Sequence, residues 1–290
     1  MTMLFMKKKY QLERFFVTWL MILFMILTDA FTAFAQVKQA TFLVNGISCD
    51  LEQGILKVEF VTPDVVRVQY TGENTFIGNG TDVCLPRAVD NPVRWVYTPN
   101  PDCYLLKSDS LIVRVDLSTA SITYLDKEGG LLLQEDQNIP RISEKRVTKQ
   151  VIYDEHSKHI EKTADGDKEI KNVLRYDTIG HTWKYRINFK WQPLEALYGW
   201  GAHMEDYMNL RGKELYLCQH NLKAMVPVLN STAGYGLLFD AGCAMMFKDN
   251  SEGSFVELEA AKQIDYYFMK GKTMDAMFDQ IADCLRADEK

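Results

Sequence analysis

Apolar and polar residues alternate with a period of two along most of the first half of the chain, between Ala40 and Gln134. The alternating runs lie at residues 56–60, 66–70, 94–97, 104–107, 111–116, 121–125 and 131–134. Such a pattern is typical of strands with one face on a core and one face in water. Pro63-Asp64 separates the first two runs, and Asp126–Gly130 forms a glycine-bearing hairpin loop between the last two. Many short strands at this spacing predict an all-β fold, an antiparallel β-sandwich.

The second half continues the strand pattern and ends in one helix. Trp183–Trp191 places five large apolar residues on one strand face, which we expect to pack on a second sheet; an aromatic sugar-stacking platform is the alternative. Further strands are predicted at 256–258 and 264–268. Thr273 is a candidate N-cap, and the apolar residues after it recur at helical spacing, which predicts an amphipathic helix over 274–285.

Residues 141–177 are the most polar portion, with charges of mixed sign. This composition favours a solvated hairpin or surface excursion over a binding tract. His156 and His159 are three apart and could present two metal ligands on a helix face. The neighbouring Val151–Tyr153 is typical of a strand, however, and no third ligand is evident. We therefore predict neither a metal site nor a cofactor.

The glycine-rich stretch Leu197–Lys248 has the pattern of a binding site. Glycines this close together indicate positive-φ turns or close backbone approach. Polar residues on loops between strands are frequent in binding sites. Two polar clusters lie between the glycines, and their candidate residues are His203, Glu205, Asn209 and Arg211 in the first and Gln219, His220 and Asn221 in the second. The alternative is a set of sheet edges and turns with solvated side chains.

Residues 1–35 have the three parts of a secretory signal peptide. Lys7–Lys9 form a positive region, Phe15–Leu27 form an apolar region, and Ala33–Ala35 offers a small-residue cleavage site before Gln36. A transmembrane anchor is the alternative, although about 13 apolar residues are few for a membrane span. We expect an exported protein, periplasmic or extracellular, with no membrane contact after cleavage. The β-sandwich would then occupy residues 36–272, followed by a helical segment over 273–290.

Charge and cysteine content narrow the classes of partner. The chain has 33 Lys and Arg against 39 Asp and Glu, and no basic tract follows the signal. Nucleic acid is therefore not an expected partner, and a neutral ligand fits the charge balance better. The six cysteines contain no C-x-x-C pair, which excludes the usual zinc and thioredoxin-like spacings. Export permits disulfides, but the apolar neighbours of each cysteine equally suit buried free thiols.

Four ordered segments resemble one known family. Tyr198–His203, Asn209–Gly212, Leu217–Asn221 and Val226–Asp240 are similar to the N-terminal domain of glycoside hydrolase family 31, and the resemblance covers most of Ala40–Leu285. It implies a galactose mutarotase-like β-sandwich, which in the family precedes a (β/α)8 barrel. Family members are mostly retaining α-glycosidases of α-glucosides or α-xylosides, and both catalytic aspartates lie in the barrel.

The resemblance implies an accessory role for this chain. No residue here matches either catalytic aspartate, so we expect no catalytic residue and no activity of the chain alone. The family uses a loop of this domain to close the sugar pocket, and Gln219, His220 and Asn221 match it best by position. His203, Glu205, Asn209 and Arg211 are second candidates. Ala202 departs from the Glu or Gln that the family commonly has there, which weakens any specific role for that position.

The implied partners are an α-linked glycoside, bound through a parent enzyme, and a barrel domain if another chain supplies it. The helix at 273–290 would lead into that barrel, and we expect a frameshift or a split gene to have truncated the chain before it. Two other functions are weighed. One is a stand-alone carbohydrate-binding or scaffold module. The other is a mutarotase-like epimerase, for which His203, His220 and Glu205 supply the acid and base types.

Overall fold

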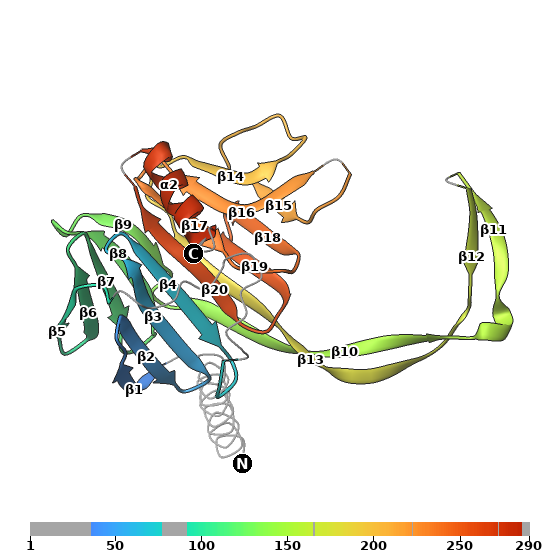
Figure 1. The fold of residues 1–290 in the computed structure, drawn as a ribbon, viewed down its shortest axis with the longest axis horizontal. Coiled ribbons are helices and arrows are strands. Elements are labelled where there is room, and N and C mark those ends of the chain that lie inside the picture. The colour runs from blue at the N-terminus through green and yellow to red at the C-terminus, as the bar shows by residue number, and fades with distance from the viewer. Residues whose placement is uncertain (1–35, 77–91, 165, 222, 272, 286–290) are drawn as a thin grey trace, which may run out of the picture. The chain divides into compact units, whose positions relative to one another are not determined.

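Antiparallel strands make up most of the computed structural model, which describes residues 36–76, 92–164, 166–221, 223–271 and 273–285. The strands form two large sheets (Figure 1). Sheet A runs in the order β1 (Val37–Phe42), β2 (Gly46–Leu51), β3 (Ile55–Thr62), β4 (Val65–Thr71), β20 (Ile264–Lys270), β17 (Tyr235–Phe239), β16 (Ala224–Ser231) and β14 (Leu197–Ala202). Sheet B runs in the order β15 (Glu214–Leu217), β18 (Met245–Asn250), β19 (Gly253–Ala261), β13 (Val173–Lys190), β9 (Leu131–Glu135), β8 (Ile122–Asp126), β7 (Leu111–Asp116), β6 (Cys103–Ser108) and β5 (Trp95–Pro99), and β10 (Arg141–Tyr153) also pairs with β13.

The core lies between the inner faces of the two sheets and is rich in aromatic side chains. Tyr124 of sheet B stacks on Phe268 of sheet A with ring centroids 3.9 Å apart. The five apolar residues of the Trp183–Trp191 face are all buried. Their predicted packing against a second sheet is therefore confirmed, and the all-β sandwich is confirmed with it. The predicted signal peptide, residues 1–35, lies outside the described residues.

One strand departs from the predicted pattern. Arg67 and Gln69 of β4 were expected to face water, but Gln69 is buried and Arg67 is half-buried. The expectation is wrong here because β4 lies between β3 and β20 in the middle of sheet A. Arg67 forms a two-point ion pair with the buried Asp265 of β20, with Nε to Oδ1 at 2.9 Å and Nη2 to Oδ2 at 2.6 Å. The face of β4 that carries Arg67 and Gln69 is therefore largely buried, although its polar residues are typical of a solvated face.

The predicted helix is confirmed as α2 (Met274–Leu285). Its predicted N-cap is also confirmed, because the backbone N–H of Ala276 donates to Thr273 Oγ1 at 3.2 Å. Met277 is buried and lies over Gly236 and Gly271, so sheet A supplies at least part of the partner that the apolar face of the helix needs. Among the described residues, no helix combines the length and apolar character required to cross a membrane.

The polar portion forms a long hairpin that continues past the sandwich (Figure 1). β10 and the first part of β13 pair from Arg141–Ile187 out to Tyr153–Val173. Beyond them lie a short 3-10 helix, η1 (Glu155–Ser157), and a two-stranded sheet of β11 (His159–Thr163) and β12 (Gly166–Ile170). The predicted solvated hairpin is confirmed. We call its two-stranded part, residues 145–153 and 173–183, the arm.

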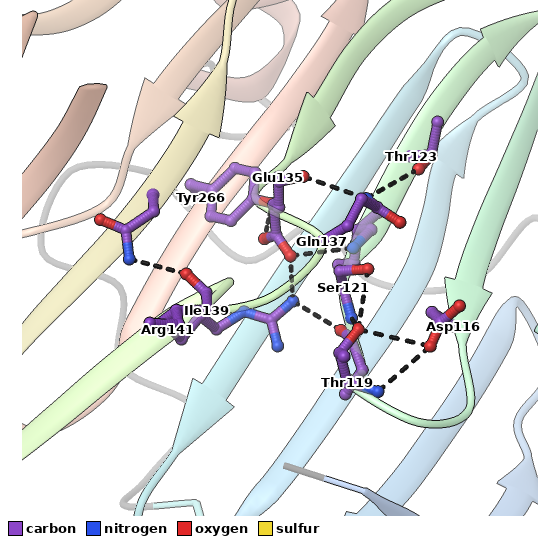
Figure 2. A network of polar contacts seen from close by, with 12 residues as sticks. Asp116, Thr119, Ser121, Thr123, Glu135, Gln137, Ile139, Arg141 and Tyr266 are labelled. Carbon is purple, nitrogen blue, oxygen red and sulfur yellow. Dashed lines mark hydrogen bonds and ion pairs between the residues drawn. The ribbon is translucent and has the colours of Figure 1, made fainter. Parts of the chain in front are cut away.

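A buried polar network joins the two sheets (Figure 2). Arg141 of β10 pairs with Glu135 of β9, and both side chains are almost fully buried. Glu135 also accepts hydrogen bonds from the backbone N–H of Ile122 at 2.9 Å and from Tyr266 Oη of sheet A at 3.1 Å. Arg141 Nη2 additionally donates to the carbonyl of Ala120 at 2.9 Å. The network therefore fixes how sheet A lies on sheet B.

The described cysteines are of two kinds. Cys49 and Cys103 are buried free thiols, and Cys218 is a half-exposed free thiol. Burial raises the pKa of the Cys49 thiol to about 12, which leaves very little of the reactive thiolate at neutral pH. The alternative of buried free thiols therefore holds for Cys49 and Cys103. Cys84 and the side chain of Cys284 lie outside the described residues.

Candidate functional site

A strained bulge in β14 sets the position of the candidate loops. Gly199, Trp200 and Gly201 all have positive φ, at 129°, 63° and 93°. The pairing of β14 with β16 shifts between Gly199 and Gly201. A Cβ on Gly201 would lie 1.9 Å from the carbonyl oxygen of Ala224, so only glycine permits this approach of the two strands.

The Trp200 side chain holds this bulge in the core. It is fully buried, and its ring lies 5.6 Å from that of Phe239 in sheet A and 6.0 Å from that of Phe247 in sheet B. A bulky residue at positive φ is uncommon and persists only where the surroundings determine it. The chain consequently leaves β14 at Ala202, opposite Ala224 of β16.

Residues 218–221 and 223 lie in a turn between β15 and β16. The backbone of His220 and Lys223 forms an isolated antiparallel bridge, with Lys223 N–H donating to the His220 carbonyl at 3.1 Å. Gln219 Oε1 accepts from the backbone N–H of Met225 at 3.0 Å, so the Gln219 carbonyl group supports the turn itself. Gln219, His220 and Asn221 are all exposed at the tip.

An ion pair joins this turn to the loop that follows β14. Lys223 Nζ lies 2.7 Å from Glu205 Oε1. The hydrogen bond from Lys223 holds the pKa of Glu205 below its usual range, so Glu205 remains charged at neutral pH. His203 Nε2 donates to the Trp200 carbonyl at 2.8 Å, and His203 Nδ1 lies 3.9 Å from Glu205 Oε2. We call the two loops, residues 203–208 and residues 218–221 with 223, joined by the ion pair between Lys223 and Glu205, the clasped loops.

The structure thus brings five of the seven predicted residues together, namely His203, Glu205, Gln219, His220 and Asn221. The other two support the scaffold. Asn209 Oδ1 accepts from the backbone N–H groups of Leu197 and Arg211, each at 3.1 Å. The Arg211 guanidinium donates to Asp249 Oδ2 at 2.9 Å and to the carbonyl of Gln192 at 2.8 Å.

Sequence reasoning missed Lys223, although it connects the two loops. Its signal was available, since Lys223 is the first cation after the second polar cluster. No group of three or more His, Cys, Asp or Glu side chains in the described ranges is arranged to hold a metal ion. His156 lies in η1, and His159 Nδ1 lies 3.0 Å from the Ser157 carbonyl. The clasped loops can therefore offer amide, imidazole and backbone groups for hydrogen bonding, with a carboxylate that is already neutralised by its lysine.

The fold defines an antiparallel β-sandwich domain whose glycine-rich end carries two polar loops. Residues 55–247 match the glycosyl hydrolase 31 N-terminal galactose mutarotase-like domain, and the chain belongs to this family. An α-xylosidase of Saccharolobus solfataricus is 22% identical over 229 residues, which are 76% of this chain and 26% of that protein. A family 31 glucosidase of Pseudescherichia vulneris is 30% identical over 98 residues, which are 33% of this chain and 18% of that protein.

Solved structures show the same fold. A family 31 dextranase of Flavobacterium johnsoniae, complexed with isomaltotriose, superposes with a TM-score of 0.65 at 17% identity, covering 87% of this chain and 28% of that one. A family 31 α-xylosidase from a soil metagenome, complexed with xylose, gives 0.65 at 18% identity, covering 86% and 35%. This chain thus spans about a fifth to a third of the length of these relatives.

Proposed function

We propose that this domain is the accessory sandwich of an exported retaining α-glycosidase, of α-glucosidase or α-xylosidase type, and that its clasped loops complete the carbohydrate pocket. The observation that carries the proposal is the convergence of Gln219, His220 and Asn221 with His203 and Glu205 at one end of the sandwich. Short amide and imidazole groups suit hydrogen bonding to sugar hydroxyls. The Lys223 to Glu205 ion pair holds the two loops together.

On this proposal the chain supplies binding contacts and no catalytic carboxylate. Glu205 is paired with Lys223, and His203 Nε2–H donates a hydrogen bond to the Trp200 carbonyl. Neither is free to act as the acid or base of an epimerase, so we do not propose that activity. A stand-alone carbohydrate-binding module would use the same loops, and the two functions differ in affinity because a module must bind sugar without a second domain.

We expect isomaltotriose or methyl α-xyloside to bind the full chain weakly, with a Kd of about 1 mM or above, corresponding to about 4 kcal/mol. NMR titration should show shifts confined to the clasped loops. His220→Ala and Asn221→Ala should each weaken binding about three- to tenfold, the effect of one lost hydrogen bond. The matched control is Asn172→Ala, another exposed asparagine, far from these loops along the chain.

The same samples test the absence of catalysis. Release of p-nitrophenol from α-glucosides or α-xylosides should not exceed the uncatalysed rate. Shifts outside the clasped loops, or binding unchanged in both loop variants, would refute the proposed site. Saturable binding about a hundredfold tighter, near 10 μM, would favour the stand-alone module instead.

Export is part of the same proposal and is supported by the charged, apolar and small-residue segments of residues 1–35. Expression of the full chain in a secreting host should yield protein whose N-terminal residue is Gln36, as read by mass spectrometry. The control carries Ala33→Arg and Ala35→Arg, which remove the small residues at the cleavage site and should leave the precursor uncleaved. Recovery of the wild-type chain with Met1 intact would contradict export by this route.

A further inference from the structure

The arm continues one face of the sandwich core into solvent. Alternate residues of β10 share a face with their β13 partners, from Ser143 opposite Tyr185 and Lys145 opposite Trp183 outward. Tyr185 and Trp183 point into the core and are buried. The residues that continue this face along the arm are Val147, Lys149, Val151 and Tyr153 on β10, and His181, Thr178, Tyr176 and Val173 on β13.

This face of the arm is largely apolar, although no described strand covers it. Val147 is 61% exposed, Tyr176 60% and Tyr153 49%. The opposite face carries mainly polar residues, such as Arg146, Gln150 and Asp177. An isolated two-stranded ribbon is marginal in water, and three or more strands with an apolar face are needed for independent stability. The arm therefore requires additional strands or a covering layer.

The two edges of the arm differ in how well they are protected. Both register shifts fall on β13, where Ile179 and Leu174 are the extra residues, and such bulges disturb an edge for further pairing. β10 runs without a bulge, a glycine or a proline from Arg141 to Tyr153. Within the described ranges, β13 is the one strand that pairs with β10. The open edge of β10 is thus free to accept another strand.

We propose that β10 pairs antiparallel with β10 of a second copy of this chain, about a two-fold axis at Gln150, so that two arms form one four-stranded sheet. This register places Val147 opposite the partner's Tyr153 and Thr148 opposite the partner's Ile152. It also places Arg146 opposite the partner's Asp154. Both apolar faces then lie on the same side of the sheet.

Charge complementarity favours this register over two of its neighbours. An axis at Lys149 would place the two copies of Lys149 opposite each other, and an axis at Val147 would place Lys145 opposite the partner's Lys149; like charges directly opposite are unfavourable. Both members of this pair have local contacts as well, since Arg146 pairs with Glu144 and Asp154 Oδ1 caps η1. A two-fold, self-complementary contact is the commonest way in which soluble chains associate.

Cysteine substitution tests the register. In Gln150→Cys the two cysteines would face each other across the axis with Cα atoms about 4.5–5.5 Å apart, within the range of a disulfide. We expect a covalent dimer under mild oxidation, formed about tenfold faster than in either control. The two controls are Lys149→Cys, which moves the thiol one residue along β10, and Thr178→Cys, which places it on the bulged edge of β13. The wild-type chain gives the rate of cross-linking through the native cysteines.

Charge reversal tests the association itself. Sedimentation should give the mass of two wild-type chains, and Arg146→Asp or Asp154→Arg should each shift the protein toward single chains. The double variant R146D/D154R restores the opposite-charge pairs in both copies and should recover the dimer. A single-chain mass at every concentration would overturn the proposal and assign the arm to another partner. Equal cross-linking in Thr178→Cys, or no recovery in the double variant, would overturn it too.

Discussion

Replacing Gly201 with alanine is expected to lower the free energy of unfolding by about 3–5 kcal/mol, the sum of positive-φ strain and a steric clash. The Cβ would lie 1.9 Å from the Ala224 carbonyl oxygen and 2.8 Å from Val226 N, both of them backbone atoms of β16 that have little freedom to move. The separation of β14 and β16 would also release the clasped loops. Urea denaturation followed by tryptophan fluorescence measures the change.

The chain contains a close control for this substitution. Gly129 has φ of 92°, against 93° at Gly201, but no atom lies within 4 Å of its would-be Cβ. Gly129→Ala should therefore cost only the conformational strain, about 1–2 kcal/mol. The difference between the two variants isolates the close approach of β14 and β16. Equal losses in both variants would show that the bulge is not held by this contact.

Sequence periodicity was sufficient for the elements whose environment repeats every two or 3.6 residues. The alternation around Val58, the Trp183–Trp191 face and the helix after Thr273 were predicted because each apolar position faces a core. The same logic failed for β4. Arg67 and Gln69 look solvated in a two-residue pattern, but their partner Asp265 is 198 and 196 residues away in the chain, and no local pattern reports such a pairing.

The candidate site was predictable in part for a similar reason. The glycines around Trp200 mark a turn, and the polar residues after them mark loops, so the sequence located the region. Which side chains gather there depends on strand pairing. The bridge at His220 brings Lys223 to Glu205, whereas Asn209 and Arg211 point back to the scaffold. Residue type alone does not distinguish these two groups.

The Glu135 to Arg141 pair shows a further limit, because Arg141 opens the most polar portion of the chain and yet is buried. Arg141→Met is expected to lower the free energy of unfolding by about 3–5 kcal/mol, since it leaves the Glu135 carboxylate buried without its counter-charge. The matched surface control is Arg175→Met, which breaks the exposed pair with Asp177 and should cost at most about 1 kcal/mol. Chemical denaturation of each variant measures both values.

The cause of this loss can be tested by also neutralising the acid. In the double variant E135Q/R141M no buried charge remains, and the amide oxygen introduced by Glu135→Gln could still accept a hydrogen bond from Ile122 N–H or Tyr266 Oη. We expect the double variant to be at least about 2 kcal/mol more stable than Arg141→Met alone, because removal of both charges is far less costly than removal of one. Losses that simply add would show that packing, and not the unpaired charge, causes the effect.

The pH dependence of Arg141→Met provides an independent check on the same cause. Burial already raises the pKa of Glu135 in the folded wild-type chain, and removal of the Arg141 guanidinium, which opposes that rise, should raise it further. A carboxyl group with a raised folded-state pKa stabilises the fold below its unfolded pKa of about 4.3, and this contribution is lost as pH rises through the folded value. The deficit of Arg141→Met relative to wild type should therefore be small in mild acid and grow toward neutral pH. A deficit that does not change with pH would mean that Glu135 stays charged throughout, and that its remaining hydrogen bonds are sufficient to hold a carboxylate in the core.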